Sequence, residues 1–136
     1  MRYTKTIRLP LAYDDAVPVV KDAFKAQGFG ALTEIDVRAT LHEKLGEDME
    51  PYVIIGACNP GLARRALDAE REIGALLPCN VIVRQDHDGV TVDALDPAVM
   101  VTISDSPALR AVAEEAAQLI GAALDALVQA HPVPAG

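Results

Sequence analysis

Tryptophan is absent from this 136-residue chain, and the other aromatic residues are only two Phe and three Tyr. Proteins that hold single-stranded nucleic acid stack its bases on aromatic side chains, and this chain has few to offer. Basic residues are also scarce, because 12 Lys and Arg stand against 20 Asp and Glu, for a formal net charge of -8. Such a chain repels a polyanion unless its cations gather on one face, and the longest basic grouping is Arg64-Arg65. We therefore expect no nucleic-acid partner.

No stretch has the composition of a secretory signal or a membrane span. The start, MRYTKTIRLPLAYDDA, alternates charged and apolar residues and lacks an apolar h-region. The most apolar run, 107–130, is interrupted by Arg110, Asp125 and other polar residues, which is typical of an amphipathic helix. We expect a cytoplasmic protein without a membrane partner.

Cysteine is scarce as well. The chain has two, Cys58 and Cys79, and they form no Cys-x-x-Cys motif. Two thiols in a reducing compartment do not predict a structural disulfide, so we expect both to be free. Each is followed by asparagine, in GACNP and LPCNV, and this pairing is the most unusual feature of the sequence.

The length and the hydrophobic fraction of 51% fit one globular domain with one core. We predict a single domain over 1–130 and a flexible tail over 131–136. Alternating or continuous apolar patterns predict strands at 3–9, 30–37, 52–58, 80–85 and 90–95. Helical spacing predicts helices at 14–27, 38–45, 60–77 and 107–130, with a connector at 97–103.

Local signals mark several boundaries. Gly28 and Gly46 supply the left-handed residues that end the first two helices. Asn59-Pro60 predicts a helix start, because asparagine caps free N–H groups and proline at the first helical position gives up a donor that has no partner. Asp88-Gly89 predicts a tight hairpin between the last two strands.

Three stretches, QGFGALTEIDVRATLHEKLGED, PYVIIGACNPGLARRAL and LLPCNVIVRQDHDGVTVDALDP, together with the closing amphipathic helix, resemble the bacterial and archaeal domain of unknown function 302 family. The GACNP and LPCNV blocks are the most specific parts of this resemblance, which covers 7–127. It implies an α+β fold similar to the TATA-box-binding-protein-like group, with a curved, mostly antiparallel sheet of about five strands covered on one face by helices. It also implies a homodimer, and it implies no activity.

The direction of two strands decides whether the thiols can meet. A simple strand-helix-strand crossover makes the strands of Cys58 and Cys79 parallel and places the thiols about 20 Å apart, at ~3.3 Å per residue. An antiparallel pair places both thiols at one end of the sheet. The sequence alone favours the first arrangement, and the resemblance implies the second, which we adopt.

Cys58, Asn59, Cys79 and Asn80 are then the candidate ligand-binding residues. Cys58 precedes a helix N-terminus, where the helix dipole and free N–H groups favour a thiolate. Two thiols suffice for a disulfide, a persulfide relay or a soft metal ion as cofactor. The alternative is that both are core residues, because free cysteine is among the most buried residue types.

A closed zinc site needs about two more ligands, and His42 and His87 are the available donors. Their expected places, a helix and a hairpin turn, favour solvent exposure instead. Glu34 and Asp36 share a strand face and could serve as paired carboxylates. A strand with one solvent-exposed face explains these two residues equally well. The serines of Ser104-Asp105-Ser106 have no evident histidine partner and mark a helix start.

Three functions remain open. The first is a dimeric binding module whose Cys58 and Cys79 take up a thiol-reactive species, a soft metal ion or a small-molecule ligand. The second is a thiol-dependent redox or sulfur-transfer enzyme that uses Cys58. The third is a structural or partner-binding homodimer with both cysteines in the core.

Overall fold

The computed structural model describes residues 2–134 and contains one five-stranded antiparallel sheet of order β1-β5-β4-β3-β2. Along the chain the elements are β1 (Thr4–Leu9), α1 (Tyr13–Ala26), β2 (Gly30–Asp36), α2 (Val37–Leu45), β3 (Tyr52–Cys58), α3 (Pro60–Ala69), the 3-10 helix η1 (Arg71–Leu76), β4 (Cys79–Gln85), β5 (Val90–Leu95), α4 (Val99–Ile103) and α5 (Pro107–Ala130). The predicted α+β class, the five-stranded antiparallel sheet and the long C-terminal helix are confirmed.

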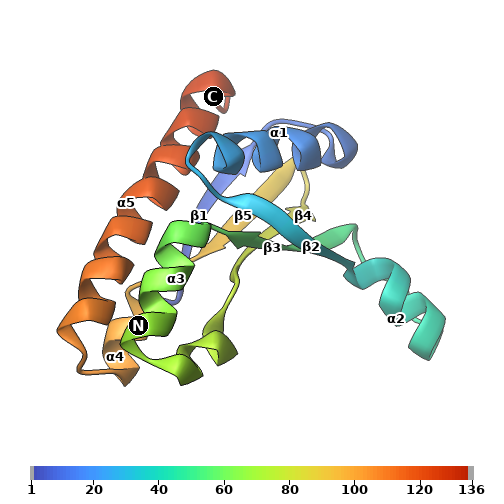
Figure 1. The fold of residues 1–136 in the computed structure, drawn as a ribbon. Coiled ribbons are helices and arrows are strands. Elements are labelled where there is room, and N and C mark those ends of the chain that lie inside the picture. Colours follow the sequence, from blue (N-terminus) through green and yellow to red (C-terminus); the bar gives the residue numbers. More distant parts are fainter. Residues whose placement is uncertain (1, 135–136) are drawn as a thin grey trace.

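Helices cover one face of this sheet and leave the other face open (Figure 1). Alternation in the strands accounts for the two faces, because Val53, Ile55 and Ala57 of β3 are buried while the residues between them point the other way. The core forms between the buried face and α1, α3 and α5. The N-terminus of β1 and the long helix α5 lie at one side of the sheet, while α2 projects from the edge strand β2 (Figure 1).

The strands that carry the two cysteines are antiparallel neighbours. Ala57 of β3 is opposite Cys79 of β4, and Val53 is opposite Val83 at the other end of the ladder. The crossover suggested by the sequence alone is therefore wrong, and the antiparallel arrangement is confirmed. The chain between the two strands makes an excursion over the buried face and returns to the sheet end that it left.

Helix starts and ends follow the sequence signals closely. The Asn59 side chain accepts a hydrogen bond from Leu62 N–H at 3.2 Å, and Ser106 caps α5 in the same way through Leu109 N–H. Gly28 and Gly46 adopt positive φ values of 87° and 68°, in the left-handed region that glycine tolerates. These boundaries are confirmed.

Two helices differ from the prediction. The helix expected over 60–77 ends at Ala69, because Glu70 is extended and the chain continues as η1. The Glu70 carboxylate accepts a hydrogen bond from the Ser104 hydroxyl, a tertiary contact that fixes the break. The connector expected at 97–103 contains the short helix α4.

The remaining differences are small. Helix α1 begins at Tyr13 without a side-chain cap, so Asp14 and Asp15 lie within its first turn and Pro18 within its second. Residues 131–134 follow α5 without regular structure, and the rest of the predicted tail, 135–136, lies outside the described residues. Within residues 2–134, no helix combines the length and apolarity that crossing a membrane requires.

Candidate functional site: a cavity shared by two cysteines

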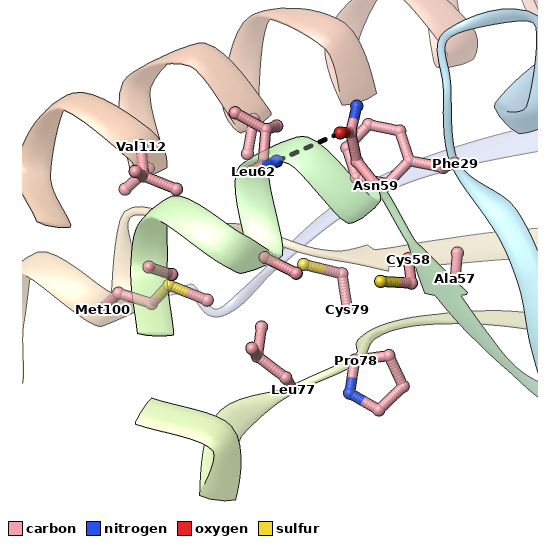
Figure 2. A pocket seen from close by; sticks show the side chains of 14 residues that line it. Phe29, Ala57, Cys58, Asn59, Leu62, Leu77, Pro78, Cys79, Met100 and Val112 are labelled. Carbon is pink, nitrogen blue, oxygen red and sulfur yellow. Dashed lines mark hydrogen bonds between the residues drawn. The ribbon is translucent and has the colours of Figure 1, made fainter. Parts of the chain in front are cut away.

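Cys58 and Cys79 line one cavity of about 30 Å³ at the end of the sheet. Figure 2 shows both side chains directed into this space, with Cys79 between Cys58 and Met100. The lining comes from β3, β4, α3, α4 and α5, and from the loops before β2, α3 and β4: Phe29, Ala57, Cys58, Asn59, Leu62, Ala63, Ala66, Leu77, Pro78, Cys79, Met100, Val112, Ala113 and Ala116. Apart from the thiols and Asn59, all of these side chains are apolar.

The strand register brings the two thiols together. Because Ala57 is opposite Cys79, the next residue, Cys58, ends β3 beside the first residue of β4. Cys58 is one position past this opposed pair, and at the strand end it lines the same cavity as Cys79. The chain between the two cysteines runs through α3 and η1 and returns to the same end of the sheet, so residues about twenty positions apart in the sequence come close together.

The two thiols differ in exposure and in acidity. Cys58 is half-buried, whereas Cys79 is 8% exposed. Burial raises the pKa of Cys79 to about 11, and the nearby charge of an ionised Cys58 adds to this rise. Cys79 is therefore protonated at neutral pH unless a ligand displaces its proton.

Two tight contacts shape the mouth of the cavity. A Cβ added to Gly56 would overlap Oγ1 of Thr33 and lie 2.8 Å from Cγ of Pro78, so the absence of a side chain lets both residues pack directly on β3. Similarly, a Cβ on Gly28 would lie 2.9 Å from Nδ2 of Asn59. Asn59 is thus held by its cap bond to α3 on one side and by the end of α1 on the other.

The other candidate residues lie elsewhere. Asn80 is exposed and outside the cavity lining, since it follows Cys79 on β4 and points to the opposite face. His42 lies on α2, where its Nδ1 is 3.2 Å from Oδ1 of Asp48. His87 lies in the loop after β4, at the opposite end of that strand from Cys79.

The weaker groupings have structural roles. Glu34 pairs with Lys21 of α1, and Asp36 caps α2 by accepting from Ala39 N–H. Ser106 caps α5. The arginines of Arg64-Arg65 form exposed ion pairs with Asp68 and Glu115. None of these residues contributes to the cavity lining.

Sequence reasoning missed most of the cavity wall. Met100 comes from the segment expected to be a connector, and Val112, Ala113 and Ala116 come from α5, which was expected only as an amphipathic helix. Leu77 and Pro78 directly precede Cys79 in the LPCNV block, so their place beside this cysteine in the sequence could have indicated that they line its cavity.

An α+β domain with one open sheet face and two free cysteines at one sheet end is the class of protein that these observations define. The family model described as "Domain of unknown function DUF302" matches residues 4–127, and the chain belongs to this family.

A solved structure supports the same assignment. The chain is similar to an uncharacterized conserved DUF302 protein from Bacillus stearothermophilus, known from a crystal structure, with a TM-score of 0.85 and 28% sequence identity. The match covers 93% of this chain and 99% of that chain. No curated protein matches the chain significantly.

Proposed function

We propose that the protein is a binding module in which Cys58 and Cys79 jointly hold a small thiol-binding species. The observation that supports this most directly is that two free thiols share one cavity whose other side chains are nearly all apolar. In such surroundings the thiols are the groups with the chemistry to retain a ligand.

The size of the cavity narrows the kind of ligand. Pockets for organic metabolites usually enclose roughly 300–1,000 Å³. A cavity of about 30 Å³ exceeds the space that one water molecule needs, but it is far too small for a metabolite. The ligand is accordingly one or a few atoms in size.

The lining favours binding over thiol-dependent catalysis. A nucleophilic cysteine usually works with an adjacent general base, most often histidine. The residues that line the cavity include no His, Asp, Glu or Lys. We therefore place the binding module ahead of an enzyme that uses Cys58.

A native mass spectrum of protein purified without reductant or chelator tests the proposal. We expect a fixed mass increment per chain that disappears in the Cys58→Ala and Cys79→Ala variants. Asn80→Ala, next to Cys79 but outside the lining, is the matched control and keeps the increment. A bare chain with two free thiols would instead support a purely structural role for both cysteines.

We further propose that the binding module is a homodimer joined through the open sheet face. Ile35, Ile54 and Ile82 lie opposite one another on adjacent strands and form an apolar row across this face. Ile35 is 49% exposed. Helix α2, which follows β2 directly, has no buried residue. Because isolated helices of this length are marginal in water, a second chain packed against α2 would stabilise it.

Charge favours a second copy as the occupant of this face. The chain carries -8 overall, so most of its surface repels another copy. On the open face, however, Arg8 pairs with Asp86 at 2.9 Å and Arg84 with Asp93 at 2.8 Å. The four charges of these two pairs cancel one another.

Molar mass in solution tests the homodimer. We expect Ile35→Lys to convert the dimer into a folded monomer, because it places a cation in the apolar row of each interface. Ile103→Lys is the matched control, since Ile103 is 62% exposed on α4, away from the sheet face. A monomeric unmodified protein, or equal effects of the two variants, would contradict this interface.

A further inference from the structure

We propose that the ligand of the cysteine cavity is a single soft monovalent cation, Cu(I), bound by Sγ of Cys58 and Sγ of Cys79. This inference rests on the binding function proposed above and specifies its ligand. The number of donor atoms, their chemical type, the charge of the complex and the route of entry all favour this ion.

The number of donors points to an ion that accepts low coordination. Within residues 2–134, no group of three or more His, Cys, Asp and Glu side chains is placed to hold a metal ion. Structural zinc sites need four ligands, and iron–sulfur clusters need about as many cysteines. Cu(I) is stable between two thiolates, so the pair alone completes its coordination.

The type of donor agrees with this choice. Thiolate and thioether sulfur select soft ions such as Cu(I), whereas magnesium and calcium require oxygen ligands. The one oxygen donor among the lining side chains belongs to Asn59, and it already accepts the Leu62 N–H. Met100 supplies the third sulfur of the lining, on the far side of Cys79 from Cys58 (Figure 2).

Binding requires the loss of two protons. Cu(I) replaces the hydrogen of each thiol, two protons leave to solvent, and the bis-thiolate complex carries a charge of one minus. The ten-residue helix α3 begins at Pro60, two residues after Cys58, and its positive N-terminal end favours this negative charge. No electron is transferred in this step.

An ion can reach the site without opening the core. Cys58, Leu77 and Pro78 are only half-buried, and all three line the cavity. Cys58 is therefore the first sulfur that an incoming ion meets. Cys79, which is more deeply buried, then binds the same ion and encloses it between the two strands.

Anaerobic titration of the full chain with Cu(I), in competition with a Cu(I) chelator of known affinity, tests this inference. We expect one Cu(I) ion to bind per chain. X-ray absorption of the complex should show Cu–S distances and no shorter Cu–O or Cu–N distances. Loss of the hydrogen-bond partner of a metal ligand lowers the metal affinity by up to roughly 100-fold. Cys58→Ser and Cys79→Ser each remove a ligand itself, so each should lower the Cu(I) affinity by more than that. Asn80→Ala, next to Cys79 but outside the cavity lining, is the matched control and changes the affinity less than tenfold.

The outcomes separate this inference from the function on which it rests. A stable sulfane-sulfur adduct on the cysteines, with no Cu(I) binding, would overturn the metal assignment and leave the binding module standing. Zn²⁺ binding as tight as Cu(I) binding would also overturn it. Thiols that hold neither copper nor any other species would overturn both proposals.

Discussion

Ala57 and Cys79 are directly opposed across the β3–β4 ladder, and this single pairing brings the two Cys-Asn motifs to one end of the sheet. The first motif ends a strand and caps α3, and the second begins the next strand. Cys58 and Cys79 therefore share a cavity, whereas their asparagines separate. Asn59 stays at the cavity, and Asn80 points to the opposite face.

Gly56→Ala should destabilise the fold and loosen the cavity mouth. The new Cβ would overlap Oγ1 of Thr33 and lie 2.8 Å from Cγ of Pro78, so both the Thr33 side chain and the segment before Cys79 must shift. We expect the free energy of unfolding to fall by about 1–3 kcal/mol, as for other overpacked sites. Urea denaturation measures the loss, and faster alkylation of the thiols reports the loosening.

Gly30→Ala is the matched control for this change. Gly30 is also a strand glycine, and it lies opposite Cys58, but an added Cβ there meets nothing within 4 Å. We expect its effect to stay within about 0.5 kcal/mol, as at other surface positions. Similar losses in the two variants would contradict the role assigned to the close packing of Thr33 and Pro78 on Gly56.

The raised pKa of Cys79 predicts that the free energy of unfolding decreases as the pH rises in the alkaline range. The pKa of this thiol is about 11 in the folded chain against an ordinary value of 9.0. Between these values the unfolded chain has released the proton that the folded chain keeps, so the free energy of unfolding falls as the pH rises, by about 3 kcal/mol. This component is intact below pH 9 and lost as the pH rises through 11.

The Cys79→Ala variant isolates this component from the lysines and tyrosines that titrate nearby in pH. The stability difference between the unmodified protein and the variant should shrink from neutral pH toward pH 11 in denaturation curves. A difference that is independent of pH would show that Cys79 ionises as an ordinary thiol.

Asp86 predicts that the free energy of unfolding also depends on pH in the acidic range. Hydrogen bonds from the Arg8 guanidinium at 2.9 and 3.0 Å, and from the Thr91 hydroxyl at 2.6 Å, hold the pKa of this carboxyl well below its usual range. The unfolded chain then takes up a proton first as the pH falls below 3.8, and the free energy of unfolding decreases. The bonds are fully present above that pH.

In Asp86→Asn this acid-dependent part should vanish, and the variant should be less stable at neutral pH. Melting temperatures from about pH 2 to about pH 7 measure both effects, since they cover the titration window of the group. Equal slopes below pH 4 in the two proteins would refute a special role for this carboxylate.

Asn59→Ala should weaken the start of α3. Removing the acceptor of the Leu62 N–H at 3.2 Å costs about 1 kcal/mol, as for other N-caps. Asn59→Asp restores an oxygen acceptor and should recover most of the loss in urea denaturation. If the aspartate variant is no better than the alanine variant, the cap bond does not account for the choice of asparagine.

Much of the fold could be predicted from local patterns. β3 and β5 have the predicted bounds because their apolar residues are continuous or alternate cleanly, and Asn59 and Ser106 cap the helices that follow them. The pairing direction of β3 and β4 could not be predicted from these patterns, because a strand-helix-strand pattern favours a parallel pair and no local signal marks the helix as an excursion. Only the family resemblance favoured the antiparallel pair.

The cavity was harder to predict for a related reason. Cys58 and Cys79 stand out by their repeated context, but Met100 and Val112 become neighbours only through the packing of α4 and α5. The break of the predicted helix at Glu70 likewise depends on Ser104, 34 residues further along the chain. Such contacts leave no periodicity in the sequence.

The order in which the cavity walls are synthesised has a consequence for the cell. Cys58 and Cys79 leave the ribosome well before Val112, Ala113 and Ala116, which close the cavity from α5. Until α5 packs, both thiols stand at an uncovered sheet end, where oxidants and electrophiles can reach them. The nascent chain is therefore more vulnerable to thiol damage than the finished protein, and the interval ends only when the last helix of the fold has been made.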